Sequence, residues 1–249
     1  MISRRRFLIM VGSAIAGVTL SASQVEKVLA SLHSTDDSKG IRYGMVIDLR
    51  KCNADTCTDC VDACRKVHNV PVFPGKDRVE WITLTTFAKA FPEQINEFSE
   101  IRNYRVPILC NHCENPPCVK VCPTQATFKR ESDGIVMMDY HRCIGCRYCM
   151  AACPFGARSF NWRDPREGIK EFSPDYPTRT KGVVEKCTFC AERLAKGKQP
   201  ACVEACKNDA IIFGNINNLE SEIRKILESE FTIRRKEELG TGPNIYYLL

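Results

Sequence analysis

The stretch from Cys143 to Pro154 reads CIGCRYCMAACP. Its first three cysteines are spaced three residues apart, a fourth follows four residues later, and a proline comes directly after it. This spacing is typical of thiolates that hold iron–sulfur clusters. A tight loop wraps the first three thiolates around one cluster, while the fourth, at the start of a helix, points away and ligates a second cluster. One such run therefore predicts a partner run elsewhere in the chain.

Three further runs of cysteines are present. Each of the four runs ends in Cys-x3-Cys, and together they use all 16 cysteines of the 249-residue chain. Thiolates in four groups of four match four [4Fe–4S] clusters. In chain order the runs are Cys52, Cys57, Cys60 and Cys64 (run one), Cys110, Cys113, Cys118 and Cys122 (run two), Cys143, Cys146, Cys149 and Cys153 (run three), and Cys187, Cys190, Cys202 and Cys206 (run four).

The crossover of the fourth cysteine predicts which runs share clusters. Runs two and three both end in Cys-Pro and are separated by 20 residues, so they are expected to pair, which leaves runs one and four to pair across them. The expected ligand sets are site 1 (Cys52, Cys57, Cys60, Cys206), site 2 (Cys187, Cys190, Cys202, Cys64), site 3 (Cys110, Cys113, Cys118, Cys153) and site 4 (Cys143, Cys146, Cys149, Cys122).

The predicted fold is α+β: two nested bacterial-ferredoxin-like units, each binding two [4Fe–4S] clusters, with short strands, short helices and long loops. Residues 41–104 and 166–249 form the outer unit, with an insertion and a C-terminal tail, and residues 105–165 form the inner unit. Apolar runs at 43–48, 79–87 and 135–139 predict strands. A helix capped by Asn218 is predicted to follow run four, and residues 161–181 are interpreted as a surface loop. Because the clusters would cross-link most of the chain, we expect the apo chain to be largely unfolded.

Residues 1–30 have the features of a targeting segment. Arg4, Arg5 and Arg6 precede 19 residues without a charge, and the next charged residue is Glu26. This pattern resembles a twin-arginine export signal, which suits a protein exported already folded around its cofactors; an ordinary secretory signal is the alternative. The segment is either cleaved or retained as a membrane anchor, since its length is close to the about 20 residues of a bilayer span. Residues 31–40 are predicted to be a linker. The expected location is the outer, periplasmic or extracytoplasmic, face of the cytoplasmic membrane.

The charge argues against nucleic-acid binding. The net charge is +6, and residues 1–30, with four basic residues and one acid, carry half of it. The remainder lacks the clustered basic face that nucleic acids need. The chain also shows no Walker loop, no GxGxxG after a strand and no Ser/His/Asp pattern, so no catalytic site is predicted.

Two other interpretations of the cysteines remain open. A disulfide framework is disfavoured, because thiols this close in sequence would pair with strain. Structural zinc accepts four thiolates, but its sites usually combine two Cys-x2-Cys pairs instead of a three-plus-one run followed by proline.

Several other residues lie close to the predicted ligands. His112 is expected either to donate a hydrogen bond that tunes a cluster or to be exposed in its loop. His68 and His141 have no second ligand nearby, and Trp81 and Trp162 are interpreted as packing residues. Cations directly before cluster cysteines would either offset the cluster charge or be ordinary surface charges: Lys51, Arg142 and Lys186.

The motifs resemble one family over residues 41–249. The motifs that carry this resemblance are CNHCENPPC at 110–118, CTFC at 187–190 and LGTGPNIYYL at 239–248. The chain resembles the four-cluster ferredoxin-type subunits of membrane-linked oxidoreductases, which include those of dimethyl sulfoxide, polysulfide and tetrathionate reductases and the NrfC type. The resemblance implies a chain of clusters that carries electrons between a redox subunit and a membrane subunit that handles quinone.

Within this family the chain is most similar to DsrO-type subunits of DsrMKJOP complexes. The similarity rests on the N-terminal signal, on the widened loop 53–56 of run one and on residues 147–165. It implies electron transfer between an NrfD-like quinone-interacting membrane subunit and a multihaem cytochrome c in dissimilatory sulfur metabolism, alongside other DsrMKJOP-type subunits. The alternatives are the electron-transfer subunit of a molybdopterin oxidoreductase and a free polyferredoxin.

Overall fold

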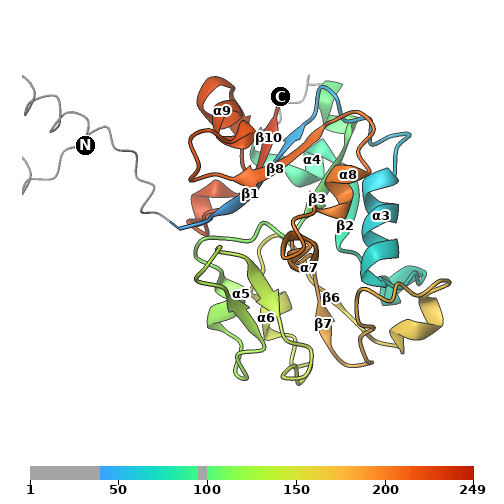
Figure 1. Ribbon diagram of the computed structural model, residues 1–249. Coiled ribbons are helices and arrows are strands. Elements are labelled where there is room, and N and C mark those ends of the chain that lie inside the picture. The colour runs from blue at the N-terminus through green and yellow to red at the C-terminus, as the bar shows by residue number, and fades with distance from the viewer. Residues whose placement is uncertain (1–39, 95–99) are drawn as a thin grey trace, which may run out of the picture. The chain divides into compact units, whose positions relative to one another are not determined.

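The computed structural model describes residues 40–94 and 100–249 (Figure 1). The predicted export signal, and the linker apart from Gly40, lie outside the described residues. Residues 40–249 cluster as one compact unit. In the described part of the chain, no helix combines the length and the apolar character that a membrane crossing would require.

A four-stranded sheet joins the start of this unit to its end. Its strand order is β8 (Ile211–Asn215), β1 (Tyr43–Asp48), β10 (Ile245–Leu248) and β9 (Thr232–Ile233). Strand β1 runs antiparallel to β8 and parallel to β10. Five consecutive residues of β1 are buried, as expected of a strand covered on both faces. The predicted strand at 43–48 and the extended C-terminal tail are therefore central elements of the fold.

Three antiparallel hairpins separate the cysteine runs. They pair β2 (Ile82–Thr86) with β3 (Arg105–Leu109), β4 (Thr127–Lys129) with β5 (Val136–Met138), and β6 (Ser159–Phe160) with β7 (Val184–Glu185). The predicted strands at 79–87 and 135–139 are confirmed in part as β2 and β5, but β2 begins only at Ile82 and Phe87 already belongs to a helix. Residues 161–181 are not wholly a surface loop, because Arg179 is buried in the core.

A helix carries the third cysteine of each run. The α-helices are α3 (Asp59–His68), α4 (Phe87–Ala90), α5 (Pro117–Lys120), α6 (Tyr148–Ala151), α7 (Ala191–Leu194), α8 (Ala201–Glu204) and α9 (Glu222–Ser229). Single 3₁₀ turns span Gly75–Asp77, Pro92–Gln94, Glu100–Asn103, Pro165–Gly168 and Glu237–Leu239. The third cysteine of every run lies in one of these helices, namely Cys60 in α3, Cys118 in α5, Cys149 in α6 and Cys202 in α8. The α+β class with short strands and short helices is confirmed.

The helix after run four starts later than predicted. Helix α9 begins at Glu222, and the hydroxyl of Ser221 accepts a hydrogen bond from the N–H of Arg224 at 3.3 Å. The predicted cap at Asn218 is wrong, because this residue instead forms a turn in which its side chain accepts from the N–H of Glu220 at 2.9 Å. Helix α9 packs on β8, and its buried Ile223 lies against Gly214.

The C-terminal tail holds the two parts of the cysteine-bearing region together. The N–H groups of Glu114 and Asn115 donate to the carbonyls of Gly242 and Thr241 at 2.8 and 2.9 Å. The hydroxyl of the buried Tyr247 donates to the carbonyl of Pro107 at 3.1 Å. These bonds join the loop of run two and strand β3 to the end of the chain, so the tail is part of the core.

Candidate metal centres

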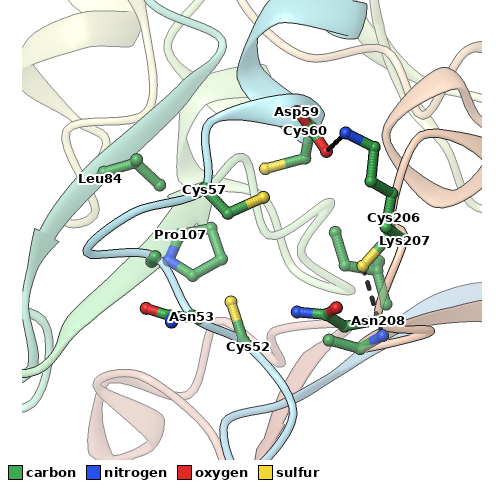
Figure 2. A pocket seen from close by; sticks show the side chains of 13 residues that line it. Cys52, Asn53, Cys57, Asp59, Cys60, Leu84, Pro107, Cys206, Lys207 and Asn208 are labelled. Atoms are coloured by element: carbon green, nitrogen blue, oxygen red, sulfur yellow. Dashed lines mark hydrogen bonds and ion pairs between the residues drawn. The ribbon is translucent and has the colours of Figure 1, made fainter.

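Site 1 is a cavity that four thiols share. Cys52 and Cys57 come from the loop after β1, Cys60 lies in the first turn of α3, and Cys206 follows α8. Figure 2 shows the four sulfur atoms pointing into the same space. At its rim Lys207 forms an ion pair with Asp59 at 2.9 Å. Run one thus meets the last cysteine of run four, because α3 and α8 pack side by side.

Sites 3 and 4 are two further cavities of the same kind. One is lined by Cys110, Cys113 and Cys118 of run two together with Cys153 of run three. The other is lined by Cys143, Cys146 and Cys149 of run three together with Cys122 of run two. Helices α5 and α6 lie against each other and exchange the final cysteine of each run.

Site 2 is the most enclosed group. Cys64, Cys187, Cys190 and Cys202 are all buried. Burial raises the pKa of Cys64 well above its usual range, and the nearby thiols of Cys187, Cys202 and Cys190 add to this rise. The structure therefore gathers the cysteines into four sets of four, and each set takes three from one run and one from another.

Several of the thiols lie where an anionic sulfur is unfavourable without a metal. Burial is the main cause that raises the pKa of Cys52 to about 11 and the pKa values of Cys60, Cys113 and Cys187 to about 12. A metal ligand must be a thiolate, so binding has to displace these protons. The sets therefore fit a group whose bond to sulfur offsets the cost of burying the charge.

Backbone amides are directed at several of these sulfurs. The N–H groups of Phe189, Ala201 and Ala210 donate to the sulfurs of Cys187, Cys190 and Cys206 at 3.4, 3.4 and 3.3 Å. Hydrogen bonds to cysteine sulfur are one of the means by which a protein sets cluster potentials. Four thiols with amide donors, and no carboxylate or histidine among the four, are a soft donor set that suits an iron–sulfur cluster or zinc.

His112 is buried, so of the two alternatives for this residue the exposed loop histidine is wrong. Its ring stacks on Phe189 with centroids 3.7 Å apart, and its Nδ1 accepts from the N–H of Val136 at 3.2 Å. Burial holds its pKa well below the usual range, and the charges of Lys186 and Arg158 lower it further. The stack joins the loop between Cys110 and Cys113 to the loop between Cys187 and Cys190, so sites 3 and 2 are neighbours.

Histidine 68 has polar partners that its sequence position did not predict. Its Nδ1 lies 3.1 Å from the carbonyl oxygen and 3.7 Å from the sulfur of Cys64. Its Nε2 lies 2.9 Å from Glu192, and Trp81 packs 4.7 Å from the ring. Ligand atoms of His68, Cys190 and Glu192 come within 4.8 Å of one another, but Cys190 already belongs to site 2. We therefore assign His68 a role in supporting the loop of site 2.

A buried ion pair supports the same region. Arg179 and Glu185 are fully buried and pair at 2.5 Å, and Glu185 also accepts from the indole of Trp81 at 2.8 Å. Arg179 donates to the carbonyl of Asn69 at 2.8 Å as well. Sequence reasoning missed this pair because both residues lie in charged stretches that resemble a solvated surface. Of the three cations that precede cluster cysteines, Lys186 is buried, whereas Lys51 and Arg142 are exposed.

The fold and these thiol sets define a protein of the iron–sulfur type, and comparison with known proteins agrees. Residues 101–167 and 172–216 match the family model described as a 4Fe-4S dicluster domain. The chain is 44% identical to the Hdr-like menaquinol oxidoreductase iron-sulfur subunit 1 of Archaeoglobus fulgidus, over 99% of this chain and 98% of that protein. It is 41% identical to the iron-sulfur cluster-binding subunit of menaquinone reductase of Nitratidesulfovibrio vulgaris, over 84% of this chain and 89% of that protein.

A third relative is protein NrfC of Escherichia coli, at 38% identity over 98% of this chain and 94% of that protein. The chain belongs to the family of NrfC-like iron–sulfur electron-transfer subunits. The family resemblance seen in the motifs is thereby confirmed, and [4Fe–4S] clusters are its cofactor type.

Proposed function

We propose that this protein carries single electrons along four [4Fe–4S] clusters held by the thiols of sites 1, 2, 3 and 4. The observation that carries the proposal is the composition of the four sets, each with three thiols from one run and the last thiol of another. A set composed in this way is what the crossover of two-cluster ferredoxins requires. The architecture is then two nested ferredoxin-like units, with runs one and four in the outer unit and runs two and three in the inner one.

The protein contributes ligation, burial and spacing. Bound clusters would supply one-electron redox chemistry, which no side chain in the four sites offers by itself. The chain supplies the thiolates, amide donors to sulfur and an apolar cover that keeps water from the inner sites.

The four sites follow a single order through the molecule. Helix α3 carries Cys60 of site 1 and Cys64 of site 2 one helical turn apart, and α5 with its C-cap region carries Cys118 of site 3 and Cys122 of site 4. The stack of His112 on Phe189 connects site 2 to site 3. The order is therefore 1, 2, 3, 4.

The ends of this series are the sites that reach the surface. Cys146 of site 4 is exposed, and Cys52, Cys57 and Cys206 of site 1 are partly exposed. All four cysteines of site 2 and the first three of site 3 are buried. Electrons are thus expected to enter and leave at sites 1 and 4, and to pass through sites 2 and 3 in the interior.

The partners proposed are an NrfD-like quinone-interacting membrane subunit and a multihaem cytochrome c, within a DsrMKJOP-like complex of dissimilatory sulfur metabolism. Support comes from relatives that are subunits of a menaquinol oxidoreductase and of a menaquinone reductase. The second candidate is the electron-transfer subunit of a molybdopterin oxidoreductase. It is favoured by 39% identity to a tetrathionate reductase subunit of Salmonella typhimurium, over 99% of this chain and 88% of that protein.

Native purification from membranes under anaerobic conditions tests these proposals together. Four [4Fe–4S] clusters require about sixteen iron and about sixteen sulfide per chain, with a brown absorbance that fades on reduction. A colourless zinc protein would refute the cluster proposal. Mass spectrometry of the complex separates a haem subunit from a molybdenum subunit, and release by salt alone without a partner would indicate a free polyferredoxin.

We further propose that the protein acts on the outer face of the cytoplasmic membrane after folded export by the twin-arginine route. The support is the charge pattern of residues 1–30, in which Arg4, Arg5 and Arg6 precede the uncharged stretch. A variant with lysine in place of Arg4 and Arg5 should keep its clusters but remain in the cytoplasm. Export of that variant at the wild-type level would refute this route.

A further inference from the structure

Two cations are buried between neighbouring cluster sites of the proposed series. Lys186 is fully buried, and its ammonium donates to the carbonyls of Val136 and Cys187 at 2.5 and 2.7 Å. Arg158 is 6% exposed, and its guanidinium donates to the hydroxyl of Thr127 at 2.8 Å. One comes just before run four and the other just after run three, so both lie next to the thiols.

Neither cation has a carboxylate partner within the residues that the structure describes, 40–94 and 100–249. The contrast is Arg179, which is equally buried but paired with Glu185 at 2.5 Å. A buried charge is costly unless an opposite charge offsets it, and neutral carbonyls and a hydroxyl offset only part of that cost. The counter-charge of these two cations is therefore not a side-chain carboxylate.

Cysteines of sites 2, 3 and 4 lie close enough to these cations to interact with them electrostatically. Arg158 lines the cavity of site 3. Its guanidinium interacts electrostatically with Cys118 and Cys110 of site 3 and with Cys149 of site 4, and it is hydrogen-bonded to Cys118. Lys186 adjoins Cys187 of site 2, and through Val136 it reaches the wall of the site 3 cavity. Lys186 thus lies between sites 2 and 3, and Arg158 lies between sites 3 and 4.

We propose that Lys186 and Arg158 are built-in counter-ions that raise the reduction potentials of the clusters at sites 2 and 3, with Arg158 acting on site 4 as well. This inference rests on the proposed function. Reduction of a cluster adds one electron and one negative charge, supplied by the neighbouring cluster, and no bond forms or breaks. A fixed positive charge in a poorly screened interior favours the reduced, more negative form. Lys186 and Arg158 would thus not ligate a cluster but act on it through the electric field of their charge.

The test is an EPR-monitored redox titration of the full-length, cluster-loaded protein. Lys186→Gln and Arg158→Gln remove the charge and keep a hydrogen-bond donor. Each should lower the potential of at least one cluster by the equivalent of a tenfold or larger change in the reduction equilibrium, about 59 mV for a one-electron couple. Lys186→Arg and Arg158→Lys keep the charge and should stay close to the wild type.

The matched control is Lys207→Gln. Lys207 also lies beside a cluster site, near Cys57, but its side chain is 81% exposed and paired with Asp59. Water and salt screen such a charge, so its removal should change the reduction equilibrium less than about threefold.

Iron and sulfide analysis of each preparation makes the outcomes decisive. Full cluster content with unchanged potentials in both glutamine variants would overturn the inference and leave the proposed function standing. If the glutamine variants fail to assemble clusters, Lys186→Arg and Arg158→Lys decide the question. Full cluster content at wild-type potentials in these two variants supports the counter-ion role, and their failure to assemble clusters overturns it. Wild-type protein without iron and sulfide would instead refute the proposed function itself.

Discussion

Removing single thiols tests the exchange of cysteines between runs most directly. Cys153 belongs to run three by sequence, yet it lines the cavity of Cys110, Cys113 and Cys118 and not the cavity of Cys143. Cys153→Ala is therefore expected to damage the cluster at site 3 and to leave the cluster at site 4 in place. The reason is geometric, because α6 turns the thiol of Cys153 toward α5 and away from the loop of its own run.

The magnitude follows from counting sites. If a site loses its cluster when it lacks a thiol, each damaged site removes about four of about sixteen irons. The double variant Cys110→Ala/Cys153→Ala affects one site and should keep about twelve. The double variant Cys143→Ala/Cys153→Ala removes the same number of thiols but affects two sites, so it should keep about eight.

The assay is iron and sulfide analysis of anaerobically purified protein, with EPR spin counting after reduction. The two double variants are matched, since each lacks Cys153 and the first cysteine of one run. The opposite order of iron content, with the Cys143 double variant keeping more, would mean that each run holds its own cluster. Equal losses in the two would show that the sites are not independent. The opposite order would refute the assignment of Cys153 to site 3, whereas equal losses would refute the independence of the sites on which the expected iron contents rest.

Three further predictions concern stability and pH. Arg179→Met leaves the buried Glu185 carboxylate without its partner and should destabilise the loaded protein by about 3–5 kcal/mol in anaerobic guanidinium unfolding. The double variant Arg179→Met/Glu185→Leu should recover part of this loss. A loss below about 1 kcal/mol in the single variant, which is roughly the value of a surface ion pair, would contradict the burial argument. Ser221→Ala removes the N-cap of α9 and should lower the free energy of unfolding by about 1 kcal/mol. Ser229→Ala, at the far end of the same helix, is the control, and equal effects of the two substitutions would count against a cap. Burial raises the pKa values of Cys60 and Cys187 from 9.0 to about 12, so metal binding must displace protons and is favoured as pH rises. Iron retention against a chelator should therefore be greater at pH 9 than at pH 7. Retention that is independent of pH would argue against protonated thiols in the metal-free protein. For any fraction of the metal-free chain that folds, the sign is the reverse: thiols with a raised pKa favour the folded state below pH 9, and this stability is lost as pH rises towards 12.

Much of the fold could be predicted because its signals are local. The strand at 43–48 and the strand at 135–139 each follow from a short apolar run directly before a cysteine loop. The start of α9 was predicted three residues too early. Asn218 and Ser221 are both acceptable caps, and the choice between them depends on whether Ile223 reaches the sheet beside Gly214.

The buried charges could not be predicted in this way. Arg158, Arg179 and Glu185 have the composition of surface residues, and no local pattern distinguishes them from Arg142 or Lys51. Their burial depends on segments that meet only after folding, such as strand β7 beside β6 and Trp81 beside Glu185. His112 was recognised as a residue between two ligands, but its burial involves a stack on Phe189, which lies 77 positions later in the chain.

The sequence by itself predicted the candidate ligands, their grouping into four sets and the family, because the spacing of thiols within a run is a local constraint on how a loop can surround a metal. The tertiary structure decided the rest: which sites reach the surface, and where positive charge is buried beside them. These features depend on contacts between residues distant in sequence, and the strength of an electrostatic interaction depends on how fully the surrounding chain excludes water. Spacing along the chain carries neither kind of information.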